Sequence, residues 1–213
     1  RRDLISDNAE IRREAQEYFS RCLKMLSAWK GTVLCGPCYS AVGKLTGQSR
    51  TKEEWKRAVE GLKELAKVAE DCQVKIALEP LNRFETYFLN IAEDAVRLVE
   101  EVDSPWVGIL LDTFHMNIEE KSLYQAIKQV GKHLFHVHTC ENDRGTPGEG
   151  HVEWNEVFQA LQEINYQGDL VIESFVPGVK EIARAASIWR PLAPDSDYIA
   201  RQGLKFLQKN WER

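Results

Sequence analysis

Four short hydrophobic stretches of this chain each end at or beside a carboxylate or an imidazole side chain. They are VKIALEP (74–80) with Glu79, WVGILLD (106–112) with Asp112, HLFHVH (133–138) with His138 and DLVIES (169–174) with Glu173. The four polar residues follow one another at intervals of 33, 26 and 35 positions, about one strand plus one helix each time. Hydrophobic runs that alternate with helices predict a parallel sheet covered by helices.

The intervals between these strands carry amphipathic patterns that are typical of helices. We predict a further strand at 32–36 and helices at about 8–29, 51–71, 91–102, 119–130, 153–164, 178–189 and 195–210. Asp7 is the expected N-cap of the first helix, and Thr51 with Glu54 forms a capping box for the second. Because catalytic groups of (β/α) barrels sit at the carboxyl ends of several strands, the pattern predicts an α/β fold of the (β/α)8 TIM-barrel type, with five βα units present.

The chain is shorter than the barrel type that it indicates. It has 213 residues, whereas a TIM barrel typically has about 250. It begins with Arg1 rather than with Met or a signal peptide, and it contains no linker or low-complexity segment. We therefore expect residues 1–213 to form a single, partial TIM-barrel domain whose natural beginning is missing.

Charge, hydropathy and cysteine content exclude several classes of protein. A net charge of −5 and an isoelectric point near 5.7 argue against a nucleic-acid binder, which usually has a basic face. The chain has no apolar run of about 18 residues, so no transmembrane helix is expected. Five cysteines, an odd number in a chain of this size, indicate reduced thiols and a cytoplasmic protein.

The four strand-end residues form a ligand set of known chemical preference. Two Glu, one Asp and one His favour Mn²⁺, Mg²⁺ or Co²⁺ over a structural zinc ion. Four protein ligands leave two positions of an octahedron for adjacent oxygens of a sugar, whose enediolate the metal would stabilise. The two glutamates could then remove and return a proton on opposite faces of one carbon. A single carboxylate at a strand end is more often a helix cap, but four in register indicate a site.

Three further polar residues follow the strand ends in the predicted loops. Glu85, His115 and Arg144 lie where they would rim such a site. His115 and Arg144 can donate to sugar hydroxyl groups, and Glu85 can accept from them. Taken singly, Arg144 would be a solvated loop charge and Glu85 a surface acid, so the pattern of all three carries the prediction.

Four segments resemble a known family of enzymes. They are LEPLNRFETYF (78–88), LLDTFHMN (110–117), HVHTCENDRGTPGEGHVEW (136–154) and VIESF (171–175). These segments are similar to those of the ketose 3-epimerases, the group of D-tagatose, D-psicose and L-ribulose 3-epimerases within the xylose-isomerase-like TIM-barrel superfamily. The resemblance extends over residues 7–210 and is densest over 76–175.

The resemblance implies a function and a role for each candidate residue. It implies metal-dependent epimerisation of free ketoses at C3 through a cis-enediolate, with Mn²⁺ or Co²⁺ as the usual metal and with dimers or tetramers. It assigns the metal to Glu79, Asp112, His138 and Glu173, the acid/base pair to Glu79 and Glu173, and the sugar contacts to Glu85, His115 and Arg144. The family barrel has three strands before the first helix of this chain, and we expect those strands to be lacking here.

Several alternatives stay open at this point. An aldose–ketose or hydroxypyruvate-type isomerase would use the same barrel and the same enediolate. An endonuclease IV-like barrel would need more than the five His of this chain and a basic groove. An inactive, truncated fragment would carry two unpaired sheet edges. The Cys35-x-x-Cys38 pair and His136 are expected to be packing residues without chemistry.

Overall fold

A five-stranded parallel sheet forms the centre of the protein, in a computed structural model that describes residues 2–175 and 178–211. Its order follows the chain: β1 (Val33–Gly36), β2 (Lys75–Leu78), β3 (Val107–Asp112), β4 (Leu134–His138) and β5 (Leu170–Val171). All five predicted strands are confirmed, but β5 is two residues long rather than six. The prediction of five βα units of the TIM-barrel type is therefore correct.

Eight α-helices and one short 3₁₀ helix connect and flank these strands in the described residues. They are α1 (Ala9–Ala28), α2 (Lys52–Cys72), α3 (Ala92–Val102), α4 (Thr113–Glu119), α5 (Leu123–Val130), η1 (Gly131–His133), α6 (Trp154–Glu163), α7 (Lys180–Ala186) and α8 (Ser196–Asn210). None of them combines the length and apolar character that a membrane-crossing helix needs. The arrangement matches the predicted alternation, with one helix more than expected.

The predicted helix at 119–130 is wrong at its start. The chain enters α4 directly after β3, and α5 begins only at Leu123, where Ser122 caps it by accepting a hydrogen bond from the Gln125 amide. Asp112 is the reason for the early start, because its side chain accepts from the Phe114 amide and caps α4.

The N-cap of α1 is Asn8 rather than the predicted Asp7. Its side chain accepts from the Glu10 amide. The capping box of Thr51 and Glu54 at the start of α2 is confirmed.

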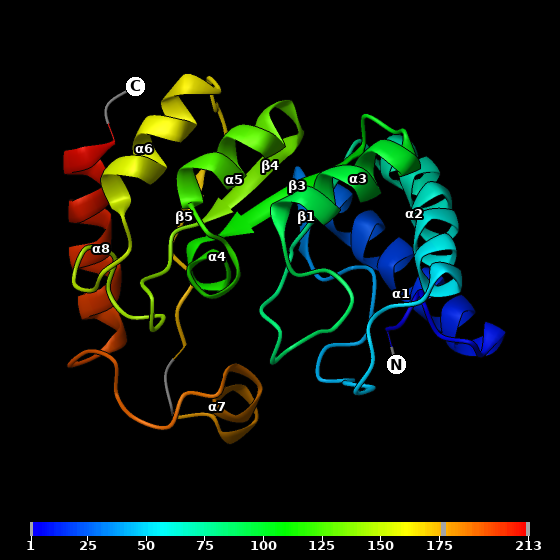
Figure 1. The fold of residues 1–213 in the computed structure, drawn as a ribbon, viewed down its shortest axis with the longest axis horizontal. Helices are drawn as coiled ribbons and strands as arrows, with labels where there is room; N and C mark the ends of the chain where they lie inside the picture. The colour runs from blue at the N-terminus through cyan, green and yellow to red at the C-terminus, as the bar shows by residue number, and fades with distance from the viewer. Residues whose placement is uncertain (1, 176–177, 212–213) are drawn as a thin grey trace.

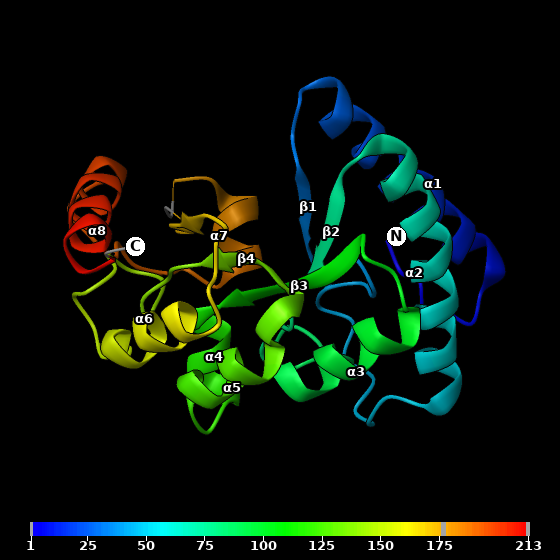
Figure 2. The same ribbon diagram turned by 90° about the horizontal axis from the view of Figure 1, so that it is seen from above.

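The sheet curls into a half-barrel. Helices α1, α2, α3, α5 and α6 cover the outer side of the curl, and α7 lies on its open side (Figure 2). The loops that follow β1 and β2 lie on the same side of the molecule as α7 (Figure 1). Since the strands are parallel, their carboxyl ends meet at one end of the curl, and polar residues at those ends are brought together.

Burial decreases from the middle of the sheet to its last strand. All six residues of β3 are buried, whereas Val171 in β5 is 38% exposed. The apolar side chains of β2 and β3 pack against the helices in one core that runs from Leu4 to Leu207. The central strands therefore provide a rigid base for their carboxyl ends.

Candidate active site

Glu79, Asp112, His138 and Glu173 meet at the carboxyl end of the sheet. Their candidate ligand atoms all lie within 4.8 Å of one another. Glu79 directly follows β2, Asp112 and His138 are the last residues of β3 and β4, and Glu173 lies two residues after β5. Asp112 and His138 are also in register across the β3–β4 pair. The structure thus brings together the four residues that the strand pattern singled out, and their role as ligands remains a prediction.

The Nδ1 atom of His138 lies at the centre of this cluster. It is 3.7 Å from Oε1 of Glu79, 3.7 Å from Oδ2 of Asp112 and 3.6 Å from Oε1 of Glu173. These distances are too long for hydrogen bonds, and the buried Nδ1 has no hydrogen-bond partner among the described residues. A buried polar atom without a partner is costly, and a cation among these four ligand atoms would satisfy it. The donor set and the unpartnered nitrogen therefore fit a divalent metal ion.

The ionisable groups of the cluster strongly perturb one another. Burial alone would lower the pKa of His138, but polar contacts with Asp112, Cys35 and Glu79 raise it to about 12. Burial and the nearby carboxylates of Asp112 and Glu79 raise the pKa of Glu173 to about 7. Burial opposes ionisation of Asp112, yet His138, His115 and Arg144 hold its pKa below the usual value. Without a cation, a proton on His138 balances the carboxylates, and Glu173 is poised to take up or release a proton near neutral pH.

Arg144, His115 and Glu85 border the cluster, as the sequence predicts, but His115 lies in α4 rather than in a loop. Nη2 of Arg144 is 3.1 Å from Nε2 of His115, 3.7 Å from Oε1 of Glu85 and 3.9 Å from Oε2 of Glu173. Nε2 of His115 lies 3.8 Å from Oε1 of Glu79. Arg144 is only 4% exposed, so it is not a solvated loop charge.

Asn82 orients two of these residues. Its main-chain N–H donates to Nδ1 of His115 at 3.0 Å, and its side-chain amide donates to Oε1 of Glu85 at 3.0 Å. Arg144 can only donate, so its 3.1 Å contact with Nε2 of His115 is a hydrogen bond only when Nε2 accepts, and a neutral imidazole cannot accept at both nitrogens. A ligand oxygen that accepts from Arg144 in place of Nε2 would allow the other tautomer, in which Nδ1 accepts from Asn82 and the Nε2–H donates to the same oxygen.

Glu141 is a residue that sequence reasoning missed. It is 1% exposed, and its carboxylate accepts from the main-chain amides of Asn142, Gly148 and Val152 and from the indole of Trp154. These four bonds hold the 139–151 loop, which carries Arg144. One signal was available, since Glu141 follows His138 by three positions, as His115 follows Asp112.

Two contacts tie this loop to the segment that carries Glu173. Ser174 donates from its hydroxyl to the carbonyl oxygen of Arg144 at 2.8 Å. The Cys140 thiol donates to the carbonyl oxygen of Glu173 at 3.0 Å, and burial raises the pKa of that thiol, which keeps it protonated. The position of Glu173 therefore depends on side chains of the neighbouring loop.

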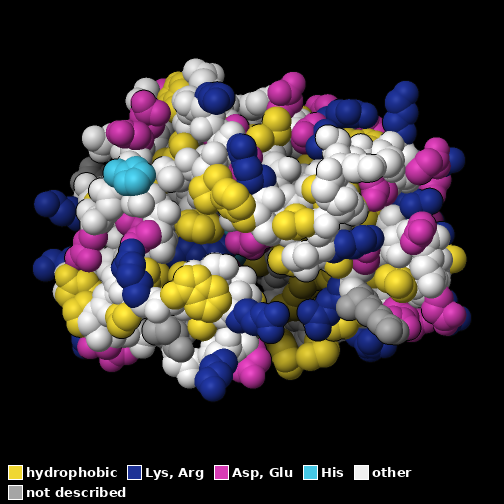
Figure 3. Space-filling view, turned by 60° about the horizontal axis from the view of Figure 1, so that its bottom comes forward, with side chains coloured by type: hydrophobic (Ala, Val, Ile, Leu, Met, Phe, Trp, Pro, Cys, Tyr) yellow, Lys and Arg dark blue, Asp and Glu magenta, His cyan; other side chains and the backbone are white. Residues whose placement is uncertain are grey.

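The outer surface on this side of the molecule has no single sign of charge. Lys and Arg side chains are interspersed with Asp and Glu side chains, and hydrophobic side chains are visible in a hollow between them (Figure 3). This mixed surface agrees with the overall net charge of −5. On the face shown, the described Lys and Arg side chains form no continuous stripe of the kind that tracks a nucleic-acid backbone.

Comparison with known proteins identifies a family. A model of the xylose isomerase-like TIM barrel family matches residues 1–210. The chain is 41% identical to a "Probable ketose 3-epimerase" of Synechocystis sp. over 209 residues, which cover 98% of this chain and 73% of that protein. It is also 41% identical to a D-psicose 3-epimerase of Enterocloster bolteae, over 91% of this chain.

A solved structure agrees in fold. The crystal structure of D-psicose 3-epimerase with D-tagatose from Clostridium cellulolyticum superposes with a TM-score of 0.93 at 37% identity, over 100% of this chain and 75% of that chain. The chain spans 64% of the Enterocloster bolteae protein, so it corresponds to between about two thirds and three quarters of these relatives.

Proposed function

Because the chain belongs to the xylose isomerase-like TIM barrel family, and within it to the ketose 3-epimerases, we propose that it inverts C3 of free ketoses. The observation that carries the proposal is the convergence of Glu79, Asp112, His138 and Glu173 within 4.8 Å, beside the buried guanidinium of Arg144. Two acids that face one small volume, with cationic and neutral donors beside them, suit proton transfer at a carbon next to a carbonyl group.

The four converging residues would hold one divalent metal ion. Three carboxylates and one imidazole suit Mn²⁺, Co²⁺ or Mg²⁺, and Mn²⁺ is our first choice. When bound, such an ion supplies Lewis-acid stabilisation of negative charge that develops on the sugar oxygens. The unpartnered Nδ1 of His138 supports this assignment, because a ligand nitrogen needs a free lone pair.

The chain's own carboxylates carry the proton transfers in this proposal. Glu79 and Glu173 approach the reacting carbon from opposite faces, so that one removes the C3 proton and the other returns a proton to the opposite face. The cis-enediolate lies between these two steps. The pKa of Glu173, raised to about 7 by burial and by Asp112 and Glu79, suits a group that must both give and take a proton near neutral pH.

Arg144, His115 and Glu85 would orient the sugar. The adjacent N–H groups of Arg144 and His115 would donate to one sugar oxygen, and Glu85 would accept from a hydroxyl group. Glu85 and Arg144 lie on loops and His115 lies in α4, and contacts with neighbouring residues hold all three, so they can hold the substrate in one geometry. Burial of Arg144 and His115 also keeps water from the developing charge.

Proton exchange at C3 tests the function directly. The purified protein, loaded with Mn²⁺, is incubated with D-fructose, D-tagatose or L-ribulose in deuterated water, and the sugars are examined by NMR. We expect deuterium at C3 and formation of the C3 epimer, both lost in Glu79→Gln. Folded protein that binds Mn²⁺ but exchanges no C3 proton of any of these ketoses would overturn the proposal.

An aldose–ketose isomerase is the second candidate, because the family model that matches is named for an isomerase. The same product analysis separates the two. An epimerase keeps the carbonyl group at C2, whereas an isomerase moves it to C1. Aldose as the main product would favour the isomerase.

Three wider properties complete the proposal. The single core from Leu4 to Leu207 supports one domain over residues 1–213. The resemblance to the family supports a homodimer or tetramer, which sedimentation velocity would measure. Five free thiols, two of them buried, support a reducing compartment such as the cytoplasm.

A further inference from the structure

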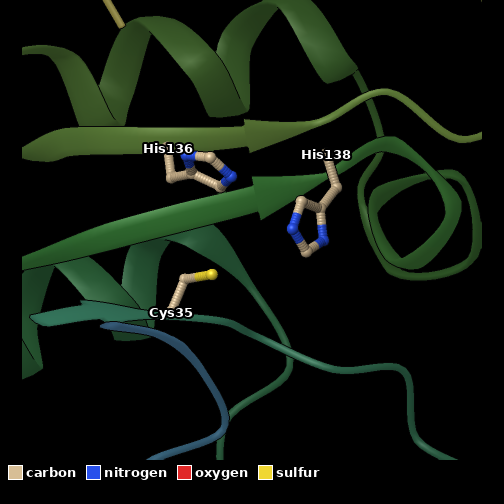
Figure 4. A group of neighbouring side chains, drawn as sticks. All are labelled: Cys35, His136 and His138. Atoms are coloured by element: carbon tan, nitrogen blue, oxygen red, sulfur yellow. The ribbon is translucent and has the colours of Figure 1, made fainter. Parts of the chain in front are cut away.

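Cys35, His136 and His138 form a second cluster of metal-binding side chains. The thiol and one nitrogen of each imidazole lie within 4.8 Å of one another. Figure 4 shows the thiol on its strand below the two rings, with its sulfur on the side of the rings. β1 and β4 are not neighbours in the sheet, and the curl brings them into contact across its inner side. The sequence pattern predicts that Cys35 and His136 are packing residues, and the structure places both of them next to His138.

Small residues stand beside Cys35 on the next two strands. On β2 the residue in register with Cys35 is Ala77, and on β3 the next one in line is Gly108. The short side chain of Ala77 leaves the space next to the thiol unfilled from β2, whereas the ring of Phe135 covers Gly108. The rings of His136 and His138 lie edge to face, with their centroids 5.2 Å apart. A single ion can reach all three side chains with small rotations.

The two clusters differ in ligand chemistry. The first has three carboxylates and one imidazole, a hard set that suits Mn²⁺ or Mg²⁺. The second has a thiolate and two imidazoles, a set that suits Zn²⁺ and other thiophilic ions. The thiol would release its proton to solvent on binding, as cysteine ligands do. Three protein ligands leave a fourth tetrahedral position for water.

His138 belongs to both clusters. Its Nδ1 faces the three carboxylates at 3.6–3.7 Å, and Figure 4 shows a ring nitrogen on the side of His136 and Cys35. A neutral imidazole has one lone pair and one N–H. An ion bound through Nε2 therefore leaves the proton on Nδ1, where it donates toward the carboxylates. Occupation of the second cluster thus removes a ligand from the first.

We propose that Cys35, His136 and His138 form a second metal site, which binds a thiophilic divalent ion such as Zn²⁺ and weakens metal binding at the carboxylate cluster by taking His138. Thiophilic ions would then act as inhibitors from a site of their own. This inference concerns metal binding alone and does not require that the protein turn over a ketose.

Cobalt gives a direct readout of the thiolate ligand. Co²⁺ is titrated into the metal-free protein without sugar, and the near-ultraviolet band of thiolate-to-cobalt charge transfer is recorded. We expect the band in the unmodified protein, its loss in Cys35→Ser and its retention in Cys72→Ser, a matched change of a half-buried thiol at the end of α2. Zn²⁺ should abolish the band by displacing cobalt.

Competition between the sites is measured with Mn²⁺. The protein is loaded with Mn²⁺, Zn²⁺ is added, and released Mn²⁺ is followed by its paramagnetic resonance signal. We expect Cys35→Ser to require at least about tenfold more Zn²⁺ than the unmodified protein for the same release. Residues that only support a metal ligand are typically worth this much, and Cys35 would be a ligand itself. The His136→Asn variant should behave like Cys35→Ser, and it replaces that variant if the serine change disturbs folding.

The proposal fails on two outcomes. One is the absence of a charge-transfer band in the unmodified protein, or a band that persists in Cys35→Ser. The other is equal release of Mn²⁺ by Zn²⁺ in the unmodified protein and in both variants, which would show that zinc competes only for the carboxylates. Neither outcome bears on C3 exchange by the Mn²⁺-loaded protein, so this inference and the proposed function fail separately.

Discussion

The middle of the sheet and its last strand hold their candidate ligands in different ways. The side chains of Glu79, Asp112 and His138 are 7%, 0% and 11% exposed, at the ends of strands that have neighbours on both sides. Glu173 is 28% exposed and follows a strand of two residues. Packing fixes the first three, whereas the fourth is placed by hydrogen bonds from a loop. The difference suggests a rigid metal-binding side and a more adjustable acid/base side.

Asp112 shows how firmly the central side is built. Its Oδ1 accepts from the Phe114 amide at 2.8 Å and caps α4, while its Oδ2 faces His138. One carboxylate therefore ends a strand, starts a helix and supplies a ligand atom. At Glu173 the main chain is held instead by the thiol of Cys140, and Ser174 joins it to Arg144.

Substitutions of Asp112 and Glu173 should reveal the largest difference between the rigid side and the adjustable side. Asp112→Asn keeps an N-cap, since Asn caps helices as well as Asp, but removes a charged ligand of the rigid set. We expect Mn²⁺ affinity to fall by at least about 100-fold and C3 exchange to disappear with it. Glu173→Gln should lower Mn²⁺ affinity by only about tenfold and still reduce C3 exchange by about 1,000-fold, as expected for loss of an acid/base group.

Isothermal titration with Mn²⁺ and deuterium exchange at saturating Mn²⁺ provide the two measurements. Circular dichroism controls for folding of both variants. Equal losses of Mn²⁺ affinity in the two variants would contradict the distinction between a rigid and an adjustable side.

The pH dependence of stability should carry a signature of Glu173. Burial and two carboxylates raise its pKa to about 7, above the usual value of 4.5. Between these values the folded protein binds more protons at this group than the unfolded chain does, so its contribution to stability falls as pH rises through about 4.5 to 7. We expect a loss on the order of 2 kcal/mol for the metal-free protein over this range.

Urea denaturation in the presence of a chelator, at pH 5 and pH 7, measures this loss. Glu173→Gln is the reference, because it removes this titrating group and leaves the titrating groups outside the cluster unchanged. The loss of unfolding free energy between pH 5 and pH 7 should be larger in the unmodified protein than in Glu173→Gln, and this excess should shrink when Mn²⁺ is present, since a bound cation favours the ionised carboxylate. An equal loss in the two proteins would show that a group other than Glu173 binds the proton.

The sequence allowed the rigid side to be predicted better than the adjustable side. Hydrophobic runs that stop at Glu79, Asp112 and His138 reflect burial on both faces of a strand, and burial leaves a clear pattern. The length of β5 did not follow from its apolar residues, because a strand at the edge of the described sheet has few neighbours to extend it. The start of α4 was missed because Asp112 is at once strand end and cap, with no turn residues between the two elements.

Long-range contacts explain what else the sequence could not predict. Glu141 gains its role from donors that the loop folds back onto it, and these donors follow no periodic pattern. Cys35 and His136 meet only because the sheet curls, which brings β1 to β4. The residue types at the four strand ends were sufficient to predict that these side chains meet. The remaining contacts depend on how the loops and the sheet fold, which the sequence pattern does not show.

Substitution of Glu141 tests whether the adjustable side can be disturbed without an effect on the rigid side. Glu141→Gln replaces one accepting oxygen by an amide that donates, and each oxygen accepts two hydrogen bonds, so two of the four are lost in a buried place. We expect KM for the ketose to rise about tenfold through displacement of Arg144, while Mn²⁺ affinity stays unchanged. Glu149→Gln, an exposed change on the same loop, is the control. A fall in Mn²⁺ affinity equal to the rise in KM would show that the loop also supports the metal-binding side.

The smallest effect should come from the capping box far from the site. Thr51→Ala removes the hydroxyl that accepts from the Glu54 amide at the start of α2, on the outer side of the curl. N-caps of this kind contribute about 1 kcal/mol, so we expect the free energy of unfolding to fall by that amount in urea denaturation. Mn²⁺ affinity and C3 exchange should not change, because packing of β2 and β3 fixes Glu79 and Asp112 independently of the first turn of this helix. A loss of Mn²⁺ affinity in Thr51→Ala would show that the central side is held by its helices as much as by its strands, and the contrast with Glu173 would then be one of degree.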